Sequence, residues 1–190
     1  HWKHDSVYNS YDSYYDGAWK SSTTTGGNFL TGKNGGKLIF QYANNNTQGS
    51  AITWNNGMVL NTAGNVGIGT QTFNATNAEK LLVDAGTTTS VNAIVGKGSI
   101  NSYLQLNIQN NSSGASASSD VVATANNGSE TTNYIDMGIN GGSNASGVMG
   151  AANDAYLYNV GQNLLLGTGT AAKSVVFMTG GTTQSTNERM

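Results

Sequence analysis

The acidic side chains offer the main opportunity for acid–base chemistry in this sequence. A glycosidase needs two carboxyl groups, one to protonate the leaving group and one to attack or to activate water. The candidates are Asp120, Glu130, Asp136 and Asp154. They are dispersed along the chain, and Asp favours turns because its side chain bonds to nearby backbone. We therefore interpret them as solvated or turn-capping groups, except Asp136, which shares one face of a predicted strand with Tyr134.

Other catalytic or metal-binding groups are scarce. His1 and His4 are the only histidines, and a Ser-His-Asp triad would require one of them beside a distant Ser and Asp. The chain has no Cys, so zinc has no thiolate ligands, and no loop has the residue spacing of a calcium site. We predict that the protein is not an enzyme, with no catalytic residue, no metal and no cofactor.

Two glycine-containing stretches have a superficial likeness to phosphate-binding loops. The stretch 64–70, Gly-Asn-Val-Gly-Ile-Gly-Thr, lacks the spacing of the dinucleotide motif, and no helix is predicted after it. The stretch 96–99, Gly-Lys-Gly-Ser, lacks the upstream Gly and the Lys-Ser/Thr pair of a P-loop. Neither stretch is predicted to bind a nucleotide.

The stretch 64–70 is better interpreted as a packing element at a module boundary. Gly64 and Asn65 form a turn, after which Val66 and Ile68 share one face of a short strand. Gly67 and Gly69 lie on the other face, where the absent side chain allows another backbone to approach closely. We expect that backbone to belong to a neighbouring chain.

An aromatic group near the N-terminus is a candidate ligand surface. Tyr14, Tyr15 and Trp19 flank Asp16-Gly17, a strong turn dipeptide, so a short hairpin is predicted here. Aromatic rings stack on sugars, and these three are possible ligand contacts. Packing against a neighbouring chain or the next strand is the favoured interpretation, because each ring has a large apolar area to bury.

The composition excludes several classes of protein. Charged residues make up 9%, against about 25% in average domains, and the net charge is −2 with a single Arg. A nucleic-acid surface needs clustered basic residues, so we expect no nucleic-acid partner. No apolar run approaches the roughly 18 residues of a membrane helix, so no membrane insertion is expected. The chain begins at His1 rather than Met, and we expect a longer polypeptide.

The alternation of apolar and polar residues predicts an all-β fold. Strands are expected at 37–42, 51–54 and 58–60, with Asn56-Gly57 as a hairpin turn, and then at 81–84 after a helical turn at 73–80. In the second half we expect six strands, at 103–109, 120–125, 134–139, 155–160, 163–166 and 174–178. The predicted organisation is a β-rich module at 1–70, a connector at 71–90 and a β-sandwich-like module at 91–190.

Several motifs, in this order, resemble modules of tailed-bacteriophage tail fibres. The first module is similar at 14–20, 51–54, 58–60 and 64–70, and 78–83 is similar to the segment that follows it. The second half resembles another fibre module at 103–110, 133–140 and 156–158. The chain departs from the pattern after the glycine motif, where Gln71-Thr72-Phe73 stands in place of the usual proline.

The resemblance implies a non-catalytic virion fibre or spike that contacts the host surface as an intertwined homotrimer. Its partners would be other copies of the chain, other virion proteins and a host cell-surface glycan or protein. Such fibres often continue into an endosialidase-type intramolecular chaperone. The expected location is extracellular, on the virion tail. A head-decorating fibre, a bacterial surface adhesin and a polysaccharide depolymerase are the alternatives.

Overall fold

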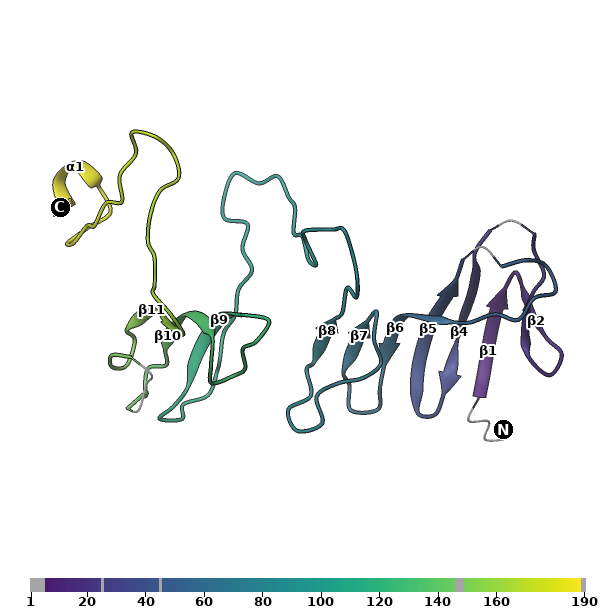
Figure 1. The fold of residues 1–190 in the computed structure, drawn as a ribbon. Helices are drawn as coiled ribbons and strands as arrows, with labels where there is room; N and C mark the ends of the chain where they lie inside the picture. Colours follow the sequence, from purple (N-terminus) through teal and green to yellow (C-terminus); the bar gives the residue numbers. More distant parts are fainter. Residues whose placement is uncertain (1–5, 25, 45, 146–148, 189–190) are drawn as a thin grey trace. The chain divides into compact units, whose positions relative to one another are not determined.

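The computed structural model describes residues 6–24, 26–44, 46–145 and 149–188. Its described part contains eleven strands and one four-residue helix, so the protein is all-β, as predicted (Figure 1). The chain divides into two compact units, residues 1–99 and 100–190. None of the described residues forms a helix long and apolar enough to cross a membrane.

The first unit is built on a six-stranded sheet. Its strands, in spatial order, are β1 (Ser6–Tyr11), β4 (Asn28–Asn34), β5 (Lys37–Ala43), β6 (Asn55–Leu60), β7 (Val66–Ile68) and β8 (Leu81–Val83). Neighbouring strands are antiparallel except β7 and β8, which are parallel. The strands β2 (Ser13–Tyr15) and β3 (Trp19–Ser21) form the predicted hairpin around Asp16-Gly17.

One face of this sheet carries the core of the unit. Leu30, Ile39 and Val59 are buried there, at 2%, 4% and 0% exposed, and lie on adjacent strands β4, β5 and β6. Three half-buried aromatic side chains cover this cluster: Tyr8, Trp19 and Trp54. Gly32 on β4 makes room for this cover, because a Cβ there would overlap Val7 and Tyr8. The core is small, so much of the apolar surface of the unit stays outside it.

Several local predictions for the first unit are wrong. Asn56-Gly57 lies within β6 instead of forming a turn, and β6 pairs with β5 through a register shift that leaves Gly57 without a partner. The segment 51–54 contributes only a bridge between Ala51 and Lys20. The strands β1 and β4 were not predicted, because β1 is mostly polar and β4 contains Gly32. Their pairing with β5 decides their conformation.

The segment 71–90 continues the sheet as well as connecting the chain. The predicted helical turn does not form, although Asn74 Oδ1 accepts hydrogen bonds from the backbone N–H groups of Thr76 at 2.8 Å and Asn77 at 2.9 Å. The Glu79 carboxylate accepts one from the Asn74 N–H at 3.0 Å. These bonds hold a compact non-helical loop that returns the chain to β8, where a strand was predicted.

The second unit contains a single three-stranded sheet in its described part. β10 (Tyr134–Asn140) lies between β9 (Ser118–Thr124) and β11 (Ala155–Val160), and both pairs are antiparallel. These three strands were predicted. The short helix α1 (Gln184–Asn187) lies near the end of the unit.

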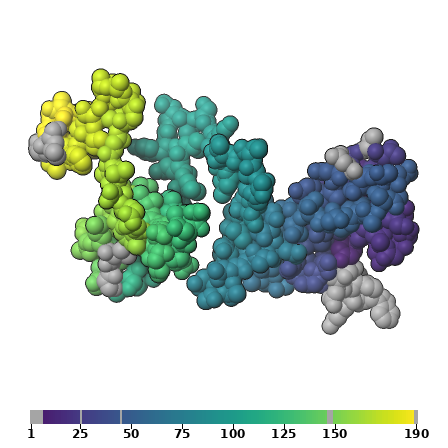
Figure 2. Space-filling view, in the orientation of Figure 1, coloured from purple at the N-terminus to yellow at the C-terminus, as the bar shows by residue number. Residues whose placement is uncertain are grey.

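The predicted sandwich is absent from the described part of this unit. Residues 103–109, 163–166 and 174–178 do not form strands, apart from a bridge between Met178 and Glu188. Leu106, which the alternation placed on a buried face, is 91% exposed. Figure 2 shows the chain after β11 as a narrow extension. Alternation marks a segment that can form a strand, but the strand also needs a neighbouring edge, which these segments do not find within one chain.

Candidate binding surface on the second unit

The polar face of the β9–β10–β11 sheet gathers carboxylates and tyrosines around one glycine. Gly138 on β10 pairs with Asp120 on β9 and with Tyr156 on β11. A Cβ at Gly138 would overlap both side chains, so only glycine allows them to meet above the central strand. There the Tyr156 hydroxyl donates a hydrogen bond to Asp120 Oδ1, and Ser118 Oγ donates to Asp120 Oδ2 at 2.6 Å. Both oxygens of Asp120 are therefore satisfied.

Three tyrosine rings form a row beside this pair. The ring of Tyr158 meets those of Tyr134 and Tyr156 edge to face, with centroid distances of 6.0 and 5.8 Å. The hydroxyl oxygens of Tyr134 and Tyr158 are 3.1 Å apart. That hydrogen bond, followed by burial and by the charge of Asp136, raises the pKa of Tyr158 above its ordinary value. Tyr158 therefore keeps its proton and can act as a hydrogen-bond donor.

Asp136 is the buried carboxylate of this face. It is 7% exposed, and its Oδ1 has no hydrogen-bond partner. Burial, followed by repulsion from Asp120, raises its pKa, while the nearby Tyr158 hydroxyl opposes that rise. An unpaired buried acceptor is costly, because it has lost its water without gaining a donor.

These side chains line a cavity of about 420 Å³. Its lining is Ser118, Asp120, Val122, Thr124, Glu130, Tyr134, Asp136, Tyr156 and Tyr158. No Lys or Arg is among them. We call this set the carboxylate–tyrosine face. No group of three or more His, Cys, Asp or Glu suited to a metal ion is found in the described ranges.

The structure therefore corrects the interpretation of the carboxylates as dispersed. Asp120, Glu130 and Asp136 line one cavity, although they lie on two strands and a loop. Asp154 lies outside it and has the expected turn role, accepting a hydrogen bond from the Ala151 N–H at 2.7 Å. The sequence alone predicted that Tyr134 and Asp136 share one face of a strand. The strand register that adds Asp120, Tyr156 and Tyr158 to their face was not.

The opposite face of the same sheet is apolar and open. Ile135, Met137 and Ile139 on β10 are 37%, 57% and 49% exposed, and Val121 and Leu157 flank them.

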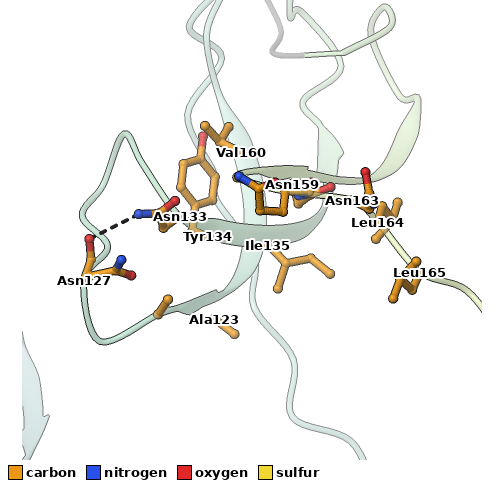
Figure 3. A pocket seen from close by; sticks show the side chains of 13 residues that line it. Ala123, Asn127, Asn133, Tyr134, Ile135, Asn159, Val160, Asn163, Leu164 and Leu165 are labelled. Carbon is orange, nitrogen blue, oxygen red and sulfur yellow. Dashed lines mark hydrogen bonds between the residues drawn. The ribbon is translucent and has the colours of Figure 1, made fainter.

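A second cavity, of about 640 Å³, lies where Ile135 and Ala123 meet the chain that follows β11 (Figure 3). Its polar lining is mainly asparagine, and the side chain of Asn133 donates a hydrogen bond to the Asn127 carbonyl at 3.3 Å. Tyr134 is the one titratable group among the described residues that line it.

The aromatic residues of the first unit divide into packed and exposed rings. Trp19 contacts Tyr8, Tyr15 and Trp54 edge to face, at centroid distances of 5.8, 5.6 and 6.1 Å. It packs against the core, whereas Tyr15 is 65% and Tyr14 is 42% exposed. Of the three predicted contact residues, the two tyrosines have rings that a ligand could reach.

The glycine motif packs differently from the prediction. Gly64 has a positive φ of 75° in the turn, and Asn65 is buried and accepts a hydrogen bond from Lys80 at 2.9 Å. A Cβ at Gly67 would overlap the Thr70 carbonyl, and one at Gly69, where φ is 78°, would overlap the Asp84 carbonyl. The backbone that approaches these glycines therefore belongs to the same chain.

Val66 and Ile68 of the motif belong to an apolar surface that covers the other face of the large sheet. The strand registers place two cross-strand rows there. The rows are Leu38, Leu60, Val66 and Leu81, and beside them Phe40, Met58, Ile68 and Val83. Six of these side chains are between 38% and 59% exposed. We call this surface the outer apolar face.

Comparison of the chain with protein-family models, curated proteins and solved structures found no match.

Proposed function

We propose that the chain is a non-catalytic segment of a homotrimeric virion fibre, a tail fibre or spike of a tailed bacteriophage, that takes part in attachment to the host surface. The order of the sequence motifs supports the fibre class. A head-decorating fibre or a bacterial surface adhesin would use the same surfaces at another location.

The exposed area is the observation that carries the assembly with other copies. The chain exposes 14290 Å² for a mass of 19.7 kDa. A compact monomer of this mass exposes about 8,600 Å², and two separate units of half the mass expose about 10,400 Å² together. The excess over two separate units is therefore roughly 4,000 Å², which is the size of an obligate protein interface.

The outer apolar face supports the same conclusion from its composition. Soluble monomers rarely expose contiguous apolar patches larger than a few hundred Å². Here two rows of aliphatic, aromatic and thioether side chains cross four strands, and the core beneath them is small. Packing against other copies around a common axis would remove this surface from water.

The alternating segment 103–109 gives the second unit a role in the same assembly. Leu104, Leu106 and Ile108 are 63%, 91% and 48% exposed. In a trimer this segment would pair with a strand of a neighbouring copy, and the predicted sandwich would then form between chains. Strands that are marginal alone are stable when an edge and an apolar face are supplied.

The test of the assembly is the mass of the protein in solution. Light scattering is expected to give three times the chain mass, and mild detergent should leave part of the trimer intact. A single-chain mass at every concentration would overturn the proposal. Labelled protein should also adsorb to some members of a panel of bacterial isolates.

A second candidate function, polysaccharide cleavage, is favoured by one observation. Asp120 and Asp136 line the same cavity, and Asp136 has a raised pKa, as a general acid requires. Incubation with host surface polysaccharide should leave its chain length unchanged if the protein is adhesive. If wild-type protein shortens the polysaccharide chains and Asp120→Asn does not, the enzymatic proposal would replace the adhesive one.

A further inference from the structure

We infer that the carboxylate–tyrosine face is a saccharide-binding site and that its ligand is a neutral, hydroxyl-rich glycan. The inference rests on the proposed host attachment and names the surface and the ligand class that would perform it. Asp136 would accept hydrogen bonds from the glycan, and the tyrosine rings would pack against its carbon skeleton.

The first argument is the unpaired acceptor. Asp136 Oδ1 is buried without a donor, and Asp136 is one of the residues that line the cavity. The terminal torsion of an aspartate is broad and roughly two-fold, so the carboxylate can turn an oxygen toward the cavity. A ligand hydroxyl would supply the missing donor. Sites with such groups select ligands strongly, because an analogue without the hydroxyl leaves the acceptor unpaired.

The second argument is the charge of the lining. Asp120, Glu130 and Asp136 are acidic, and none of the described residues that line the cavity is basic. An anionic sugar or a phosphate would be repelled, whereas a neutral hydroxyl donates to a carboxylate in a strong, charge-assisted hydrogen bond. A metal ion is a poorer occupant, because both Asp120 oxygens already accept hydrogen bonds from Ser118 and Tyr156.

The third argument is the presence of apolar surface beside the polar groups. Tyr134 and Tyr158 are half-buried and stand in a row with Tyr156, so their rings form one wall of the cavity. Tyrosine has an apolar ring and a polar hydroxyl, which suits a sugar with C–H groups on one side and hydroxyls around its edge. The cavity volume of about 420 Å³ is within the range of small-molecule sites.

The experiment measures binding of the assembled protein to immobilised polysaccharides. The neutral probes are mannan, galactan and dextran, and polygalacturonate is the anionic probe. Wild-type protein should bind at least one neutral probe and not polygalacturonate. Asp136→Asn and Tyr158→Phe should each weaken that binding about tenfold or more, because a hydrogen bond to a charged group or from the tyrosine hydroxyl is lost.

Matched variants separate the site from general effects. Asp84→Asn and Tyr103→Phe make the same chemical changes at exposed positions outside the cavity and should bind as wild type does. Light scattering confirms that every variant has the wild-type mass. Wild-type binding that survives in both site variants would overturn the inference, as would preference for polygalacturonate. Calcium binding by titration calorimetry that is lost in Asp136→Asn would overturn it in favour of a metal site.

Failure of the inference can be distinguished from failure of the proposed function. A trimer that adsorbs to bacterial cells but binds no neutral polysaccharide would refute the site and leave the fibre proposal in place. A monomer that adsorbs to no cells would refute the fibre proposal itself.

Discussion

Both units contain segments of alternating apolar and polar residues, but these segments pair into sheets to different extents in the two units. In the first, five strand pairings build one sheet, and Leu30, Ile39 and Val59 meet on adjacent strands, so one face of this sheet has a core. In the described part of the second, three strands are paired, and the alternating residues 103–109 on the N-terminal side form no strand. The buried side chains described in the first unit are all uncharged, whereas the second unit buries Asp136. The first unit therefore resembles a scaffold, and the second carries the polar groups that could recognise a ligand.

The difference shows what an apolar face requires in order to be buried. The outer apolar face of the first unit and the apolar face of the second are both exposed, although the strands beneath them are fully formed. A regular sheet guarantees the alternation of side chains, but the burial of each face depends on a second layer. In this chain the second layer is incomplete in both units, and the proposed trimer would supply it.

The largest expected effect is that of a charge in the core of the first unit. Val59→Asp places a carboxylate where the side chain is 0% exposed, so we expect the free energy of unfolding to fall by more than about 4 kcal/mol. Val121→Asp is the matched change on the open face of the second unit, where Val121 is 52% exposed.

Thermal unfolding followed by circular dichroism should show the first unit lost in Val59→Asp and both units folded in Val121→Asp. Light scattering should show that Val121→Asp weakens the assembly. Equal destabilisation by the two changes would break the comparison, because it would mean that the second unit buries its apolar face within one chain.

An intermediate effect is expected at the glycine motif. A valine at Gly67 would overlap the Thr70 carbonyl and approach the Phe73 ring, so Gly67→Val should lower the free energy of unfolding by about 1–3 kcal/mol. Gly96→Val is the control, because a Cβ at Gly96 meets no atom within 4 Å. Denaturant unfolding of dilute, dissociated protein measures the difference. A loss of assembly without any change in the stability of the dissociated chain would restore the intersubunit role first predicted for these glycines.

The smallest expected effect is a pH dependence in the second unit. The pKa of Asp136 is raised in the folded state, so this group favours folding most at low pH. That contribution is lost as the pH rises from the ordinary aspartate range through the raised pKa. Asp136→Asn lacks this loss and should melt slightly above wild type at pH 7, with the difference shrinking toward pH 3.

Several titratable groups face Asp136 and act on its ionisation. They are Asp120 on β9, Tyr134 on β10, Tyr156 and Tyr158 on β11, and Glu130 in the loop after β9. Asp120→Asn removes the repulsion between Asp120 and Asp136, so it should reproduce part of the rise in melting temperature expected for Asp136→Asn at pH 7. Melting curves of wild type and Asp136→Asn that stay parallel from pH 3 to pH 7 would contradict the assignment.

Local pattern was sufficient for the all-β class and for the strands that pair with near neighbours. The stretch 134–139 alternates and is flanked by turn residues, and both features act within a few residues of chain. The hairpin at Asp16-Gly17 was predicted for the same reason. Asn56-Gly57 was misjudged because the pairing of β5 with β6 overrides the preference of that dipeptide for a turn.

Long-range register decided the rest. Asp120 and Tyr156 are 36 residues apart in sequence, and they meet only because both pair with Gly138. The same holds for the outer apolar face, in which β5, β6, β7 and β8 must align before their separate apolar residues become one surface. Which side chains alternate is a property of the local chain, with its period of two. Hydrogen-bonded pairing between distant segments decides which of these faces lie on the same side of a sheet, and that pairing is settled only when the sheet forms.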